Sequence, residues 1–147
     1  MLKYNINVRT IFLIPLDLKK EWFENAKGGN LENMKYTYKI IKERGNEEVI
    51  KKWRGPYHRT ILMEATRLGR QNILKWLVQE FQFDVNEQSS NGSTALHIAA
   101  YHNQTECARL LLDLGSQHMK DLFGITPLDV AKEEEMQKLL ESHFNSI

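Results

Sequence analysis

One short phrase occurs three times along this chain, and it constrains the fold more than any other feature. Its copies occupy residues 59–66, 93–100 and 125–132. The aligned threonines, Thr60, Thr94 and Thr126, lie 34 and then 32 residues apart. Self-similarity near 33 residues indicates small units that stack in a row, because one unit of this size cannot bury its apolar face alone. We therefore expect a solenoid of repeats instead of a single closed globule.

Each copy carries the signals of a helix start. The hydroxyl of Thr94 or Thr126 can accept a hydrogen bond from a free amide of the first turn, which predicts an N-cap at both positions. Pro127 suits the first helical position, and Asp129 lies near the positive end of the same helix dipole. Leucine and alanine follow at helical spacing, and the small alanines allow a neighbouring repeat to approach closely. The phrase therefore predicts short, closely stacked helices.

A second amphipathic helix is expected after each of the first two copies, over residues 72–80 and 105–114. The apolar residues of these segments recur at the spacing of one helix face. Gly115 supplies the left-handed residue that ends the later helix, and Gln82 occupies the matching position in the earlier one. We interpret both segments as core elements.

The middle copy resembles an ankyrin repeat, in its phrase at 92–100 and in the helix end at 110–115 that follows it. The same residue pattern recurs in the segments that begin at Thr60 and at Asp121. The resemblance implies an all-α fold, an ankyrin-repeat solenoid of stacked helix-turn-helix units joined by hairpin loops. We expect one ankyrin repeat domain over 18–143, with a degenerate first copy and a shortened last copy as caps. Its four repeats are placed at about 18–45, 57–86, 90–119 and 121–143.

Two segments depart from the repeat. An inserted element at 44–58 separates the first two repeats, and residues 46–53 within it predict an extra helical turn or two capped by Asn46. The N-terminal arm, residues 1–17, is expected to be extended and to cover the apolar flank of the first repeat. Its apolar run is too short for a signal peptide and is broken by Pro15. We expect no membrane span.

Composition adds a compartment and a charge pattern. Cys107 is the single cysteine, so no disulfide can form within the chain, and we expect the protein in the cytoplasm or the nucleus. Residues 1–75 carry 16 Lys or Arg against 8 Asp or Glu, whereas residues 76–147 carry 4 against 11. A solenoid keeps chain order in space, so this difference predicts an electrical gradient along the stack. The alternative is ordinary variation on solvated faces.

No motif predicts catalysis. The sequence has no glycine-rich phosphate loop, no metal-spaced cysteines and no nucleophile elbow. His97 is interpreted as a residue that ties the hairpin backbone to the helix start, and Cys107 as a small buried hydrophobe. The basic stretch at 51–54 favours contact with protein over nucleic acid, and the acidic run at 133–135 a solvated helix face. The sequence therefore predicts a protein that is not an enzyme and that uses no cofactor or metal.

Proteins with ankyrin repeats generally bind partner proteins along the concave groove made by hairpin tips and first helices, and the resemblance implies the same groove here. The matching positions form one set, called the partner-binding set below: Arg54, Tyr57, Arg59, Arg67, Leu68, Gln88, Ser90, Asn91, Ser93, Tyr101, His102, Leu122, Phe123 and Ile125. Arginine and aromatic side chains dominate interface hot spots. The first candidates are therefore Tyr57, Arg67, Tyr101, His102 and Phe123.

Asn86 resembles the ankyrin position that asparagine hydroxylases can modify. The alternative interpretation is a hairpin asparagine that bonds to the backbone.

The sequence thus predicts a non-catalytic protein–protein interaction module, an adaptor or regulator that binds a partner protein of unknown identity through its concave groove. Two alternatives stay open. The chain could be a stoichiometric inhibitor of an enzyme such as a kinase, with the inserted element as a wedge. It could also be a scaffold that self-assembles through the opposite charges at its two ends, although a homo-oligomer is not our expectation.

Overall fold

The computed structural model describes residues 15–145, and no strand occurs among them. The helices in chain order are α1 (Pro15–Gly28), α2 (Leu31–Glu43), α3 (Glu48–Lys52), the 3-10 turn η2 (Pro56–His58), α4 (Ile61–Arg67), α5 (Gln71–Phe81), α6 (Ala95–Tyr101), α7 (Thr105–Asp113), α8 (Pro127–Val130) and α9 (Glu134–Asn145). The expected all-α fold class is confirmed. No helix within residues 15–145 is long and apolar enough to cross a membrane.

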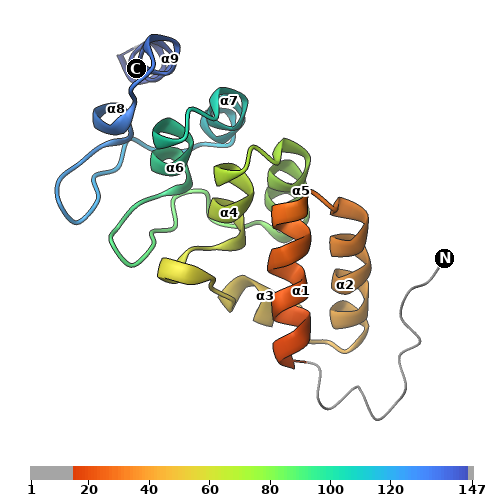
Figure 1. The fold of residues 1–147 in the computed structure, drawn as a ribbon. Coiled ribbons are helices and arrows are strands. Elements are labelled where there is room, and N and C mark those ends of the chain that lie inside the picture. Colours follow the sequence, from red (N-terminus) through yellow and green to blue (C-terminus); the bar gives the residue numbers. More distant parts are fainter. Residues whose placement is uncertain (1–14, 146–147) are drawn as a thin grey trace.

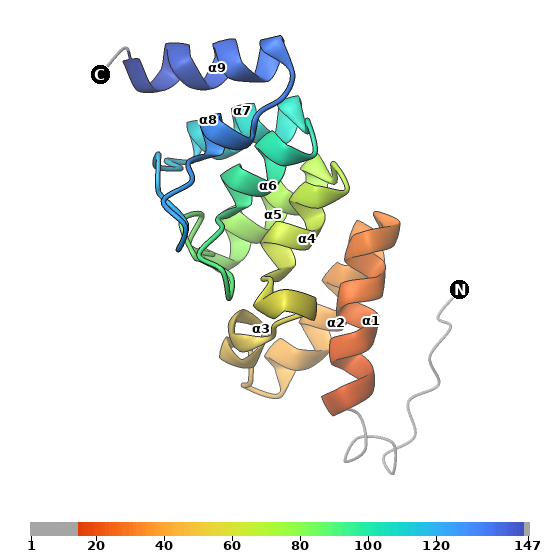
Figure 2. The ribbon, with the colours of Figure 1, turned by 60° about the vertical axis from the view of Figure 1, so that its left-hand side comes forward.

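The helices form two layers (Figure 1). The first helices of successive pairs, α1, α4, α6 and α8, contact one another in chain order along one layer. The second helices, α5, α7 and α9, do the same along the other layer, which α2 continues beside α1. The loops between pairs project together from one side of the stack (Figure 2). The expected solenoid of helix-turn-helix units is therefore confirmed.

The three repeated phrases begin helices as predicted. The hydroxyl oxygens of Thr60, Thr94 and Thr126 each accept a hydrogen bond from the amide three residues on, at 3.2, 3.4 and 3.2 Å. Alanines at one matched position of the phrase, Ala65, Ala99 and Ala131, are buried where α4, α6 and α8 stack. A larger side chain there would force the helices apart, so the small residue sets the repeat spacing.

The helix ends also follow the sequence pattern. Gly115 has a φ of 95° just after α7, and Gln82 has a φ of 54° at the C-cap of α5. Left-handed conformations end helices most easily at glycine, which has no Cβ to clash. The glutamine shows that the earlier repeat uses the same geometry without that advantage.

The inserted element contains α3 and η2, and one prediction about it is wrong. Asn46 is not the N-cap of α3, because that position belongs to Glu47, whose side chain makes no capping hydrogen bond. The amide of Asn46 donates to the carbonyl of Ile41 near the end of α2. Ile50 is fully buried, so this element is anchored in the core.

Aromatic side chains join the first pair of helices to the inserted element and to the second pair. Trp22 of α1 lies 6.4 Å from Trp53 and 5.9 Å from Trp76, between ring centroids. Tyr38 of α2 packs against Phe81 of α5 at 4.2 Å. Offset and edge-to-face aromatic pairs add about 0.5–1.5 kcal/mol each beyond area burial. This cluster is therefore the strongest connection between the degenerate first pair and the regular repeats.

The start of the chain differs from expectation at one boundary. Helix α1 begins at Pro15, so the last three residues of the expected arm at 1–17 are helical. The rest of that arm, and with it the predicted cover over the first repeat, lies outside the described residues.

Candidate protein-binding surface

Three loops project from the stack as neighbouring fingers, defined here as residues 53–59, 87–93 and 119–125. Hydrogen bonds to backbone carbonyls join them in series. The carbonyl of Tyr57 in the first finger accepts from the hydroxyl of Ser90 in the second, at 2.9 Å. The amide of Leu122 in the third finger donates to the carbonyl of Asn91, at 3.0 Å. Each finger therefore fixes the position of the next.

Side chains also hold the fingers in shape from within. The carboxylate of Asp121 accepts from the amides of Phe123 and Ile125, at 2.8 and 2.9 Å. The side-chain oxygen of Asn91 accepts from the amide of Ser93 at 3.2 Å in the second finger. Such bonds stabilise hairpin turns locally. The finger tips are therefore ordered before any partner binds.

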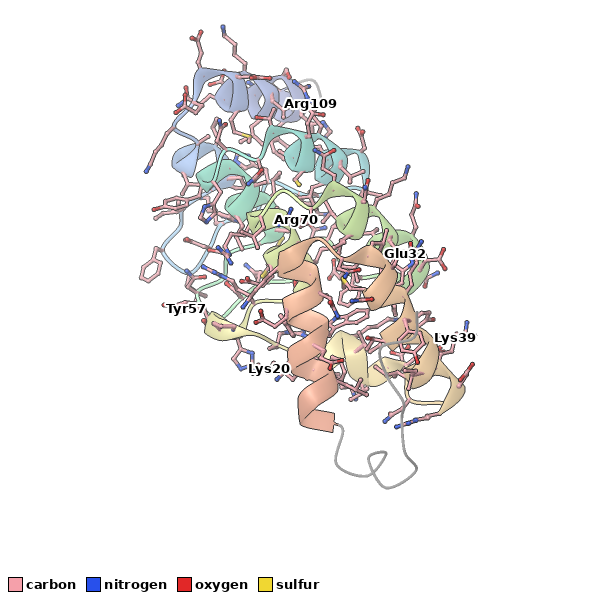
Figure 3. The ribbon with its side chains drawn as sticks, turned by 45° about the vertical axis from the view of Figure 1, so that its right-hand side comes forward. Lys20, Glu32, Lys39, Tyr57, Arg70 and Arg109 are labelled. Carbon is pink, nitrogen blue, oxygen red and sulfur yellow. The ribbon has the colours of Figure 1, made fainter. Side chains whose placement is uncertain are left out.

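The tips of the outer fingers present large apolar side chains to solvent. Tyr57 is 75% exposed, Leu122 74% and Phe123 76%. Figure 3 shows Tyr57 on the side of the fingers, across the molecule from Glu32 and Lys39 of α2. A partner protein that covers these tips would bury a large apolar area. Exposed apolar patches of this kind are typical of interaction sites.

A charged triad forms the wall of the groove beside α4. Glu64 is buried, and its two carboxylate oxygens lie 3.3 Å from Nη1 of Arg59 and 3.1 Å from Nη2 of Arg67. The guanidinium of Arg59 also lies 5.1 Å from the ring centroid of Tyr57. The sequence interpretation did not include Glu64, although its position matches Ile98 of the next repeat. An acid at an otherwise apolar position was the signal that could have found the triad.

A hollow of about 250 Å³ lies between the fingers and helix α6. It brings together five members of the partner-binding set: Arg59, Asn91, Ser93, Tyr101 and His102. Burial, followed by the positive charges of Arg67 and Arg59, lowers the pKa of His102. The other lining residues are His97, Ile98, Asp121 and Val130.

Comparison with known proteins agrees with this geometry. A family described as ankyrin repeats in three copies matches residues 62–145, which is more than half of the chain. This chain belongs to the ankyrin-repeat family. The family is typically non-catalytic, and the match indicates no enzyme family.

Individual relatives share the ankyrin region with this chain. SH3 and multiple ankyrin repeat domains protein 2 of Homo sapiens is 39% identical over 46% of the chain and 4% of its own length. Target of rapamycin complex 2 subunit AVO2 of Saccharomyces cerevisiae is 31% identical over 66% of the chain and 22% of its own length. Inhibitor of Bruton tyrosine kinase of Xenopus laevis is 33% identical over 48% and 5%. The chain thus spans less than a quarter of each of these relatives.

Several ankyrin positions in the partner-binding set are engaged within the protein. Arg54 donates to the carbonyls of Lys51 and Trp53 and forms an ion pair with Glu87 of the second finger. Gln88 donates to the carbonyl of Gly92 at 2.8 Å. Leu68 is half-buried as the C-cap of α4. These contacts order the fingers, and the part that the residues play in binding stays a prediction.

His97 joins the start of α6 to the next repeat, as predicted. Its Nδ1 accepts from the amide of Thr94 at 3.1 Å, and its Nε2 lies 2.8 Å from the carbonyl of Ile125. Because a carbonyl can only accept, Nε2 carries the proton and Nδ1 is free to accept. Burial lowers the pKa of His97, which favours this neutral form. The bond to Thr94 ties the hairpin backbone to the helix start, as the sequence interpretation expected.

Lys132 is a groove residue that sequence reasoning missed. Its Nζ lies 4.9 Å from the ring centroid of Tyr101. The repeated phrase aligns Lys132 with the buried Ala100, which gave no hint of exposure. Helix α8 ends at Val130, however, so the chain has already left the helix where α6 continues.

Asn86 connects two adjacent loops. Its side-chain oxygen accepts from the amide of Gln117 at 2.8 Å, and its Nδ2 lies 3.5 Å from the carbonyl of Gly115. The side chain thus bonds to the backbone of the following repeat, as the alternative interpretation expected. Its hydroxylation stays a prediction.

Over residues 15–145, no group of three or more His, Cys, Asp or Glu side chains is arranged to hold a metal ion.

Proposed function

We propose that this chain is a non-catalytic protein-interaction module, an adaptor or regulator, that binds a partner protein along the groove between its fingers and its first helices. The observation that carries the proposal is the hydrogen-bonded series of fingers, which holds exposed apolar tips beside the hollow of Tyr101 and His102. A surface that is ordered before binding loses little conformational entropy when a partner docks.

The side chains that could support chemistry have other roles. Cys107 is buried, and desolvation raises the pKa of its thiol to about 11, which keeps it protonated and unreactive at neutral pH. His97 uses both ring nitrogens in structural hydrogen bonds. These features support an interaction role over catalysis. The lone buried thiol also supports our placement of the protein in the cytoplasm or nucleus.

The test is affinity purification of partners from the native cell, followed by mass spectrometry. Replacing Tyr101 and Phe123 together with alanine should reduce partner recovery about tenfold or more, because exposed aromatic residues are typical interface anchors. The melting temperature should stay nearly constant, since both side chains are more than half exposed. The matched control replaces Gln79 and Glu80, which are exposed on the outer helix α5. Equal recovery with both double variants would remove this groove from the proposal.

The same experiment separates the two alternatives. An enzyme recovered with the chain, and less active when the chain is bound, would make the protein a stoichiometric inhibitor. Its inserted element then becomes the natural wedge, since Tyr57 is its exposed tip. Recovery of a second, differently tagged copy that salt releases would support self-assembly through opposite end charges.

A further inference from the structure

The groove has an uneven charge that the proposed interaction role does not explain. Two guanidinium groups, those of Arg59 and Arg67, share the single carboxylate of Glu64. The triad therefore keeps one net positive charge at the edge of the hollow. About 28% and 29% of the two arginine side chains remain exposed, so both can reach a bound partner.

One further cation, Lys52, lies beside the first finger. Lys52 and His58 are exposed beside the first finger, where they line a second hollow with Arg54 and Glu87. Arg54 is paired with Glu87, which leaves the positive charge of Lys52 unbalanced within that hollow. The groove is thus cationic along the first finger and α4.

The opposite end of the groove has a different character. Leu122 and Phe123 expose large apolar side chains on the third finger. The acid beside them, Asp121, lines the hollow and keeps its negative charge while its Oδ1 accepts from two backbone amides, so this end is not cationic. An apolar tip therefore follows a cationic wall along the direction of the stack.

From this arrangement we infer that the groove binds an acidic segment of a partner protein, with its Asp or Glu side chains on Arg59 and Arg67 and a large apolar side chain on Leu122 and Phe123. The inference rests on the proposed interaction role and names the class of partner. Arginine suits this task because its planar guanidinium keeps several donors in a fixed fork, so a bond to Glu64 leaves others for a second carboxylate.

The affinity of this site for an acidic segment then depends on Glu64. Its carboxylate competes with an incoming acid for the same two guanidinium groups. Replacing it with glutamine keeps the size of the side chain and one of its two acceptor oxygens but removes the competing charge. The acidic segment should therefore bind more tightly to Glu64→Gln than to the natural chain. A purely structural role for the triad predicts no such gain.

The experiment selects ligands for the full chain from random 12-residue peptides displayed on phage. Selected peptides should be net negative and carry at least one large apolar residue. The most enriched one, made synthetically, should bind Glu64→Gln several-fold more tightly. It should bind a variant with Arg59 and Arg67 replaced by alanine about tenfold more weakly. Lys75→Ala, which removes an exposed cation from the outer helix α5, is the matched control and should leave the affinity unchanged.

A version of the peptide with its acids replaced by amides tests the same point without altering the protein. It should bind the natural chain about tenfold more weakly. Equal affinity for both peptides overturns the inference, as does enrichment of neutral or basic sequences or of no sequence. Tighter binding of a single-stranded oligonucleotide than of the acidic peptide at this groove also overturns it. If neutral or basic peptides bind and then lose affinity with the Tyr101 and Phe123 variant, the interaction role stands and only the partner class is wrong.

Discussion

His97 connects two repeats through its two ring nitrogens, and the bond that Nδ1 accepts requires the neutral ring. Protonation of Nδ1 would remove the acceptor used by the amide of Thr94. The unpaired amide would then lie buried, which costs about 1–3 kcal/mol. His97, the first catalytic suspect in the sequence, therefore forms a hydrogen-bonded link between the second and third repeated phrases. We expect its protonation to weaken that link.

This geometry predicts how stability depends on pH. The folded-state pKa of His97 is lowered by burial, so the unfolded chain, with a value of about 6.5, takes up the proton first. The contribution is fully present above about pH 6.5 and is lost as pH falls through the folded-state pKa. Melting temperatures from pH 8 to pH 5 should fall less steeply for His97→Gln than for the natural chain. At pH 8 the variant should be less stable by about 1–3 kcal/mol.

His102 sets the control for that measurement. Its pKa is also lowered by burial, so His97→Gln should retain part of the acid sensitivity. Parallel profiles for the natural chain and His97→Gln would show that His97 does not titrate against folding.

At the scale of elements, the fingers depend on glycines at matched positions. Gly92 in the second finger has a φ of 82°, and Gly124 in the third has a φ of 76°. A Cβ on Gly92 would lie 2.7 Å from the backbone nitrogen of Leu122, whereas a Cβ on Gly124 would meet nothing within 4 Å. Only the first of these glycines lies where the following finger passes.

The pair gives a direct test of the series of fingers. Gly124→Ala should cost about 1 kcal/mol, because a residue with a Cβ is strained at positive φ. Gly92→Ala should cost roughly 1–3 kcal/mol more, since the third finger must also move away and lose its bond to Asn91. Urea unfolding measures both values. Equal losses would show that the fingers adjust independently.

Elements that depend on local signals could be predicted from the sequence. The threonine caps, the alanines between helices and the left-handed residue at Gln82 follow from neighbours within one turn. The sequence interpretation failed where a residue depends on the exact end of a helix or on a side chain in another repeat. Asn46 is held by the end of α2, and Lys132 is exposed because α8 stops early. Pairing of Arg54 with Glu87 joins residues 33 positions apart, about one repeat, but it depends on two side chains that lie outside the repeated phrase.

At the scale of the whole molecule, the charge difference along the sequence becomes a charge difference between the two ends of the stack. Chain order is kept along the stack, so the described part of the basic first half lies at one end and that of the acidic second half at the other (Figure 1). The cationic wall of the groove belongs to the basic half, and the apolar tip of the third finger to the acidic half. A bound acidic segment would therefore have a preferred direction along the groove.

Two spectroscopic signals, tryptophan fluorescence and circular dichroism, report the unfolding of different parts of the stack. The three tryptophans, Trp22, Trp53 and Trp76, all belong to the aromatic cluster of the first two helix pairs. Helix α9 lies at the far end and is reached through α7 and α8. Because each repeat contacts only its neighbours, a destabilising substitution at one end can unfold that end while the other end stays folded. Tryptophan fluorescence thus follows one end, and circular dichroism the whole stack.

Replacing the fully buried Leu140 of α9 with alanine should cost about 2–5 kcal/mol through the cavity that it leaves. That loss falls on the last pair, so the midpoint of urea unfolding should decrease more by circular dichroism than by tryptophan fluorescence. Met34→Ala makes a comparable cavity in α2, where Met34 is fully buried beside the cluster, and should lower both midpoints. Equal shifts of both signals for Leu140→Ala would mean that the four helix pairs unfold as one unit. A destabilising substitution at either end would then promote unfolding of the whole groove.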